Sequence, residues 1–265
     1  MNASFPSQIE LKLKYKYRLI LDESISFGTV GRTGRGLTEL YNVPVRVLFD
    51  PSTALVPLFK LSIVQATQID MLLGSVANGL NSAGGFCAGS RIVVDHQRIN
   101  GTSFVFSAAV PALLAVSASE GINILRSAPS ILSTLQDNIR AIRAVLERVD
   151  CITIPSHAAS PIIHIYMRSP SASPTHLLPT SPAKAGRDAQ SFDIVTEERL
   201  LQDIVDEVLA QGVWITRSRR LRGQEVFEAR PSIRLAVTAA LSRKECERAA
   251  GVIKAAAMKV LGKRK

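Results

Sequence analysis

The stretch Gly74–Ser90 reads GSVANGLNSAGGFCAGS, a run of glycines and other small residues without a charged side chain. Such a run lets the backbone approach another group closely, most often a phosphate or another part of a chain. It contains no base, no nucleophile and no metal ligand before Cys87. The stretch therefore predicts a closely packed site that has no reactive group of its own.

The composition indicates a globular protein. The chain has 265 residues, of which 46% are apolar, enough for a sizeable core in one large domain or in a large and a small one. No apolar run reaches the roughly 18–20 residues that span a bilayer, and the first residues lack the apolar segment of a secretory signal. Cys87, Cys151 and Cys246 lie far apart, and we interpret them as reduced thiols that serve packing.

The net charge of +10 is concentrated at the C-terminal end of the chain. Lys and Arg outnumber Asp and Glu by fourteen to four between residues 217 and 265, and they balance in the rest of the chain. This basic region could attract nucleic acid, anionic lipid or an acidic partner, or it could be a solvated face. Phe227 is its only aromatic residue, so it offers no series of stacking platforms for single-stranded nucleic acid.

Apolar runs and helical periodicity divide the first half of the chain into alternating elements. We expect Pro111 to open a helix to about Leu125, and a second helix over 130–149. Short apolar runs predict strands over 17–21, 69–73, 91–94 and 103–106. This alternation predicts an α/β layered fold with a mostly parallel sheet over residues 1–150.

The pattern changes at residue 151, and we predict a smaller α+β domain over 151–265. Its expected strands and helices are separated by a Pro- and Ser-rich segment, 169–191, which we interpret as a mobile surface loop. Thr196 is expected to cap one helix, which ends at Gln211 and Gly212. Strands are expected over 162–167, 213–216 and 232–239.

The last helix has the clearest start signal in the sequence. Ser242 and Glu245 form an S-x-x-E capping box, in which each side chain satisfies a free backbone N–H of the first turn. We expect this helix to end near Leu261.

Three stretches together resemble the α-oxoamine synthases, a family of pyridoxal-phosphate-dependent transferases. They are LILDESISFGTVGRTGRG at 19–36, IDMLLGSVANGLNSAGGFCAGS at 69–90 and PSIRLAVTAALSRKECERAAGVIKAA at 231–256. The resemblance extends over nearly all of residues 10–262. It implies the fold type I of these transferases, with the C-terminal part of the large domain before residue 150 and the small domain after it.

The resemblance also explains why the glycine-rich stretch has no reactive group. Active members carry D-E-A-H-S-x-G, in which the Asp pairs with the pyridine nitrogen and the His contacts the ring hydroxyl. Here Asp22 is present, but Ile25 stands at the His position. Active members also carry a Schiff-base lysine, at the position where this chain has Asn78. An amide has no free amine to form an imine, so we expect no catalytic residue in this chain.

Within the family, this pattern resembles the non-catalytic subunit of a heteromeric acyltransferase. The resemblance implies a catalytic partner, subunit 2, that carries the lysine and the pyridoxal phosphate at a shared interface. Ser107 matches a segment whose hydroxyls reach the phosphate held by the neighbouring subunit, although a strand-end or helix-capping role is an alternative. Arg234 matches the Arg that binds the substrate carboxylate, with a structural role as the alternative.

The implied reaction is the condensation of L-serine with a long-chain acyl-CoA, which begins sphingoid-base synthesis. The implied location of the complex is the cytosolic face of the endoplasmic reticulum membrane, without nucleic acid as a partner. Two other hypotheses remain open. The chain could be an independent pyridoxal-phosphate enzyme, or a basic module that binds nucleic acid or lipid.

Two departures from the family pattern give further expectations. Family members have a longer N-terminal part, with the first strands of the large domain and, in this subunit, a membrane-spanning segment. We therefore expect a sheet that lacks strands and exposes apolar surface. Residues 45–65 have no counterpart in the family, and we interpret them as an in-frame retained intron or a genuine surface insertion.

Overall fold

The computed structural model describes residues 5–43, 69–168, 194–219 and 230–262. The predicted insertion at 45–65 and the predicted loop at 169–191 lie outside these ranges. The chain divides into two compact units, Met1–Ser133 and Thr134–Lys265. The division falls inside helix α6 (Ser130–Leu146), and the predicted boundary near residue 150 lies just beyond the other end of this helix.

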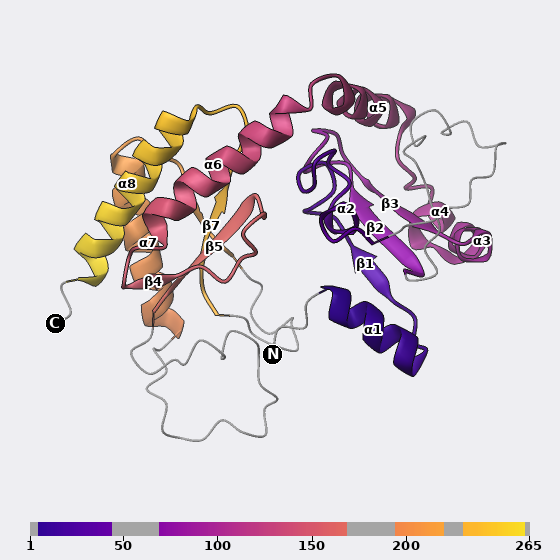
Figure 1. The fold of residues 1–265 in the computed structure, drawn as a ribbon, viewed down its shortest axis with the longest axis horizontal. Helices are drawn as coiled ribbons and strands as arrows, with labels where there is room; N and C mark the ends of the chain where they lie inside the picture. Colours follow the sequence, from indigo (N-terminus) through magenta and orange to yellow (C-terminus); the bar gives the residue numbers. More distant parts are fainter. Residues whose placement is uncertain (1–4, 44–68, 169–193, 220–229, 263–265) are drawn as a thin grey trace. The chain divides into compact units, whose positions relative to one another are not determined.

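The first unit contains a three-stranded sheet in the order β1-β2-β3 (Figure 1). Its strands are β1 (Ile20–Asp22), β2 (Met71–Ser75) and β3 (Gly85–Gly89). Strand β1 pairs parallel with β2, as expected for an α/β fold, whereas β2 and β3 pair antiparallel. The α/β class is confirmed, and the described part of the sheet has one parallel and one antiparallel pair.

Helix α1 (Phe5–Tyr15) packs on this sheet through an apolar cluster and an ion pair. Phe5 and Ile9 are buried together with residues of β1 and the segment before β2. The Nζ of Lys12 lies 2.7 Å from a carboxylate oxygen of Asp70, and Arg18 donates to the other oxygen at 2.9 Å. Burial alone would raise the pKa of Asp70, but hydrogen bonds from Lys12, the backbone N–H of Leu19 and Arg18 lower it to about 2.

Four more helices belong to the first unit, and two of them correct our predictions. They are α2 (Leu37–Leu40), α3 (Arg91–Asn100), α4 (Thr102–Val105) and α5 (Ala112–Ser127). The segments 91–94 and 103–106 were predicted as strands, but 91–94 begins α3 and 103–105 lies in α4. No residue of α3 or α4 is buried, so these apolar runs do not form the interior of a sheet.

The second unit packs three helices on an antiparallel sheet of order β4-β5-β7-β6 (Figure 1). Its strands are β4 (Ile152–Thr153), β5 (Ile162–Met167), β6 (Thr216–Arg217) and β7 (Ile233–Ala236). Alternate residues of β5 and β7, such as Ile163, Ile165 and Ile233, are almost completely buried. They form one core with α6, α7 (Ile194–Ala210) and α8 (Arg243–Leu261).

The helix ends confirm some of the sequence signals and correct one. Ser242 and Glu245 form the predicted capping box of α8, and this helix ends at Leu261 as expected. Pro111 immediately precedes α5, in its N-cap position. Thr196 does not cap α7, because the helix already includes Ile194.

Candidate functional site

The loop after β1 is organised by two neighbouring carboxylates with different surroundings. Asp22 is exposed at the end of the strand, and its Oδ1 accepts a hydrogen bond from the backbone N–H of Ser24 at 2.8 Å. Hydrogen bonding to Ser24 lowers the pKa of Asp22, so its carboxylate is ionised at neutral pH. Asp22 is therefore positioned as an exposed anion at the carboxyl end of the parallel strand pair.

Glu23 is the other carboxylate, and its side chain is almost completely buried. It accepts hydrogen bonds from the backbone N–H groups of Leu37 at 2.9 Å and Thr38 at 3.2 Å, and from the hydroxyl of Ser26. A carboxylate at this place satisfies free N–H groups in the first turn of α2. Glu23 therefore shapes the loop, a role that the sequence analysis missed.

Two glycines bring this loop against the turn after β2. A Cβ at Gly79 would lie 2.5 Å from the carbonyl oxygen of Phe27 and 2.9 Å from the Cα of Gly28. Gly28 itself has a φ of 77°, in the left-handed region that favours glycine. Side chains at either position would push the two backbones apart. The glycine-rich stretch thus allows a close contact between two backbone segments, as its sequence predicts.

This contact places Asn78 beside the loop after β1. The Nδ2 of Asn78 donates a hydrogen bond to the carbonyl oxygen of Ser24 at 2.8 Å. The structure therefore brings together Asp22, Ile25 and Asn78, three positions that the family pattern assigns to one cofactor site. Asn78 and Ile25 are both exposed, and neither carries a group that can act as a nucleophile or a base.

The β2–β3 pair contacts the loop after β1 through aromatic side chains. Gly74 lies directly opposite Phe86 in the antiparallel register, where a side chain on residue 74 would collide with the phenyl ring. The ring of Phe86 also packs edge-on against Phe27, with 5.1 Å between ring centroids. These aromatic contacts connect the strands to the loop that carries Asp22.

Ser107 lies after α4 in a strained backbone conformation. Its φ is 57°, which is uncommon for a residue other than glycine, and its side chain is exposed. It is not at the end of a strand, and the N-cap of α5 is Pro111. It does end α4, because its N–H donates to the carbonyl oxygen of Phe104 at 3.2 Å and the N–H of Ala108 donates to that of Ser103 at 2.6 Å. A left-handed residue is common at this place after a helix, so the end of α4 accounts for the positive φ, while the hydroxyl stays exposed.

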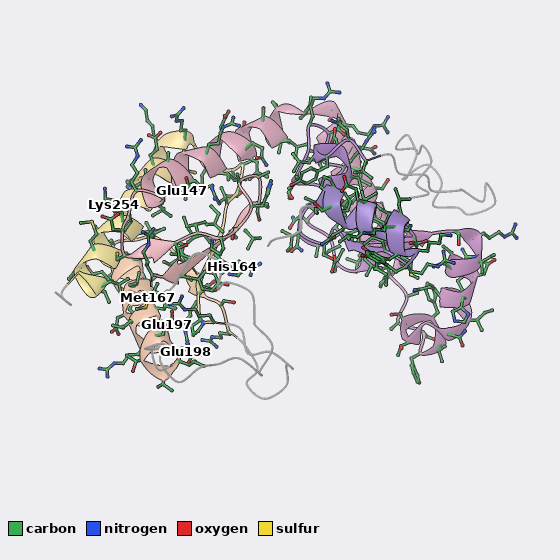
Figure 2. The ribbon with its side chains drawn as sticks, turned by 60° about the horizontal axis from the view of Figure 1, so that its bottom comes forward. Glu147, His164, Met167, Glu197, Glu198 and Lys254 are labelled. Carbon is green, nitrogen blue, oxygen red and sulfur yellow. The ribbon has the colours of Figure 1, made fainter. Side chains whose placement is uncertain are left out.

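Arg234 belongs to the second unit and is described with its own neighbours. It is exposed on β7, directly opposite His164 on β5 and Thr216 on β6. The Nδ1 of His164 lies 3.0 Å from the Oγ of Ser232, which is completely buried (Figure 2). The sequence analysis identified Arg234 but missed this His–Ser pair, because no motif connects residues so distant along the chain.

A comparison with protein families matches residues 12–253 to the aminotransferase class I and II family. The match covers both units. The chain belongs to this family. Membership of this family agrees with the α/β fold of the chain.

Curated proteins similar to this chain are named as serine palmitoyltransferase 1 or as long chain base biosynthesis proteins. "Serine palmitoyltransferase 1" of Dictyostelium discoideum is 34% identical over 95% of this chain, which covers 45% of the relative. "Serine palmitoyltransferase 1" of Saccharomyces cerevisiae is 31% identical over the same share, with 44% of the relative covered. "Long chain base biosynthesis protein 1c" of Oryza sativa is 35% identical over 74% of this chain. The chain spans about half the length, or less, of the curated relatives it matches.

Solved structures of the aminotransferase class confirm the fold. A high-resolution structure of SPT with a PLP internal aldimine has a TM-score of 0.67 at 16% identity, covering 96% of this chain and 51% of that one. Serine palmitoyltransferase of Sphingomonas wittichii has a TM-score of 0.67 at 17% identity, covering 97% and 51%. An 8-amino-7-oxononanoate synthase of Francisella tularensis has a TM-score of 0.62 at 14% identity, covering 93% and 57%.

The cofactor of this family is pyridoxal phosphate, and the residues around Asn78 do not fit a covalently held copy of it. Among the described residues of the first unit, the lysines are Lys12, Lys14 and Lys16, which all precede β1. The Asn78 turn follows β2 at the opposite end of this parallel strand pair. No amine of the described part of the first unit is thus available there, and no imine-forming step is assigned to these residues.

Two further features are absent from the described ranges. Within them, no helix is both long and apolar enough to cross a membrane. The same ranges contain no group of three side chains suited to hold a metal ion. All three cysteines are free thiols, and Cys246 is buried in the core of the second unit.

Proposed function

We propose that this chain is the non-catalytic subunit 1 of a serine palmitoyltransferase. In this role it supports the condensation of L-serine with a long-chain acyl-CoA to 3-oxosphinganine, the first step of sphingolipid synthesis. The catalytic partner, subunit 2, holds the pyridoxal phosphate and supplies the lysine. The names of the curated relatives support this assignment.

The observation that carries the proposal is the hydrogen bond from Asn78 to Ser24. It fixes an amide where the family pattern has a lysine, beside the exposed Asp22. An amide nitrogen is conjugated with its carbonyl and cannot attack an aldehyde. This chain alone is therefore inactive, and its site has kept the backbone shape without the nucleophile.

The first unit also offers a surface for the partner, which we name the α3–α5 apolar surface. Large apolar side chains are exposed along this continuous stretch of chain: Ile92, Ile99, Phe104, Val105, Phe106, Val110, Leu113, Val116 and Ile124. Exposed apolar surface of this extent is typical of protein interaction sites. We propose that it forms the heterodimer interface, in the obligate class of about 2,000 Å² or more.

Ser107 lies within this surface and gives the chain a role in the partner's site. Its exposed hydroxyl lies in the left-handed turn that ends α4, which fixes the backbone at this place. We assign it as a donor to the phosphate of the cofactor held by subunit 2. Asp22 and Arg234 keep the residue types of the family's cofactor and carboxylate contacts, and we assign them weaker, supporting roles.

The complex is proposed to act at the cytosolic face of the endoplasmic reticulum membrane. Its acyl-CoA substrate is amphiphilic and its product is a lipid, so a membrane surface is the natural place for the reaction. Within this chain no contact with the membrane is assigned.

Borohydride reduction tests the proposal directly. The chain is incubated with pyridoxal phosphate, reduced, digested and mapped, alone and in complex with subunit 2. We expect no label on the peptide of residues 74–90 and full labelling of the lysine of subunit 2. The Asn78→Lys variant is the control, because it supplies an amine at the same place and shows that the peptide can be labelled.

Label on residues 74–90 of the unchanged chain would overturn the proposal in favour of an independent pyridoxal-phosphate enzyme. Asn78→Lys alone should not restore transferase activity, because Ile25 provides no hydrogen bond to the ring hydroxyl. Turnover by that single variant in the absence of subunit 2 would also contradict the non-catalytic assignment.

A further inference from the structure

A groove on the second unit lies between α6 and α8, on a face that the proposed function does not use. Its volume is about 550 Å³, within the roughly 300–1,000 Å³ of small-molecule sites. The two helices run side by side in both views, and Lys254 marks the α8 wall (Figures 1 and 2). The groove is therefore formed within one unit and by rigid elements.

The walls of this groove carry more positive than negative charge. Four cationic and two anionic side chains line it: Arg140, Arg148, Arg243, Lys254, Asp137 and Glu247. Arg140 pairs with Asp137, and Arg243 Nε lies 2.8 Å from Glu247. The pKa of Arg243 is raised, chiefly by this hydrogen bond and then by the negative charge of Glu247. Burial lowers it by a smaller amount, and the negative charge of Asp137 raises it by less still. Both acidic groups are thus already paired.

Arg148 and Lys254 are the two cations left over. The structure gives neither of them an ion pair or a hydrogen bond with any described residue. Glu147, next in sequence to Arg148, pairs instead with Arg143 at 2.8 Å (Figure 2). Arg148 comes from the turn that follows α6 and Lys254 from α8, so an anion in the groove would meet one cation from each side.

The floor of the groove is small and apolar. Ala141, Ala144 and Val145 line it from α6. The α8 wall contributes only the charged side chains Arg243, Glu247 and Lys254, so the apolar part of the lining comes from α6.

We propose that the α6–α8 groove binds a phosphate ester, with the phosphate between Arg148 and Lys254 and an apolar part over the alanine floor. A guanidinium and an ammonium are the side chains best suited to phosphate oxygens. The volume fits a small molecule or a lipid headgroup. Nucleic acid is a weaker fit, because no aromatic side chain lines the groove for base stacking. The inference does not depend on the subunit assignment.

The test measures binding of two phosphate sources to the full chain. One is glycerol 3-phosphate, followed by calorimetric titration. The other is phosphatidylcholine vesicles with and without phosphatidic acid, followed by co-sedimentation. The double variant Arg148→Gln with Lys254→Gln should weaken binding about tenfold or more, which corresponds to at least ~1.4 kcal/mol. The matched control is Lys244→Gln with Arg248→Gln, which removes the same charge from α8 outside the groove.

Each outcome decides the proposal. Binding of glycerol 3-phosphate that only the groove variant loses supports a soluble ester, and binding of acidic vesicles alone, lost in the same way, supports a lipid headgroup. No binding of either, or equal losses in both double variants, overturns the proposal and leaves a general basic surface. Binding of duplex DNA that both double variants weaken equally would likewise overturn the proposal and indicate a general basic surface.

Ala144 provides a second test that leaves the charge unchanged, because it lines the groove from α6 and is exposed. Ala144→Leu should abolish phosphate-ester binding by filling the groove, while Ala144→Ser should keep most of it. Leucine is nearly as good a helix former as alanine, so the melting temperature of Ala144→Leu should stay level. Unchanged binding by a folded Ala144→Leu variant would contradict the assigned place of the ligand.

Discussion

The two units bury their apolar residues very differently. In the second unit a single cluster joins 21 buried residues from the sheet and all three helices. In the first unit the described residues form two separate clusters of five and four, and the α3–α5 apolar surface is exposed. The described apolar residues of the second unit therefore lie mostly in one core, whereas the first unit leaves the α3–α5 apolar surface exposed to water, and we propose that subunit 2 covers it.

The largest expected effect is the loss of the heterodimer when a charge enters the α3–α5 apolar surface. Leu113 is 79% exposed in the chain, so Leu113→Asp should leave its melting temperature unchanged. An unpaired charge buried at the interface costs about 3–5 kcal/mol, which weakens the complex with subunit 2 more than a hundredfold. Co-purification measures this. The control is Leu209→Asp, an exposed leucine on α7 of the second unit, and equal loss with both variants would contradict the proposed surface.

The next effect concerns the core of the second unit. Leu201 on α7 is completely buried, so Leu201→Ala should lower the free energy of unfolding by about 2–5 kcal/mol. Leu209 lies on the same helix and is 56% exposed, so Leu209→Ala should change it by less than about 0.5 kcal/mol. Chemical denaturation of both variants checks the difference. Similar losses of unfolding free energy in the two variants would contradict the role of Leu201 in the core of the second unit.

The smallest effect is expected at Ser107 and only in the heterodimer. In the proposed complex Ser107→Ala removes one donor to the phosphate of the cofactor held by subunit 2, which should weaken cofactor binding about tenfold, or ~1.4 kcal/mol. Ser107→Gly removes the same hydroxyl and also relieves the backbone strain at a φ of 57°. Cofactor titration of the complex should therefore give the same loss for both variants, while the melting temperature rises only for glycine. Unchanged cofactor affinity in both would remove Ser107 from the site.

The sequence predicted the second unit well because its signals are local. The capping box at Ser242 and the strand alternation of 162–167 each depend on residues a few positions apart, and both are confirmed. The first unit was harder. Short apolar runs such as 91–94 fit a strand or a helix equally, and in the structure this run lies in the exposed helix α3. Strand β3 was missed because its glycines are poor strand formers, although backbone pairing with β2 holds them.

The site was predictable in its residues and not in its contacts. Asp22, Ile25 and Asn78 came from motif positions, and the structure places them on adjoining loops. The hydrogen bond from Asn78 to Ser24 and the buried role of Glu23 were missed, because each joins residues through tertiary packing. The sequence alone does not show which of two adjacent acidic residues, Asp22 and Glu23, is buried and stabilises the loop.

The contact between Gly28 and Gly79 has a consequence for how such chains are classified. The two backbones touch without any contribution from the side chain of residue 78, so the fold requires these glycines whether or not the site is catalytic. Glycine spacing alone therefore does not distinguish a catalytic chain from a non-catalytic one. The diagnostic position is residue 78 itself, whose side chain is exposed and hydrogen-bonds to the loop after β1.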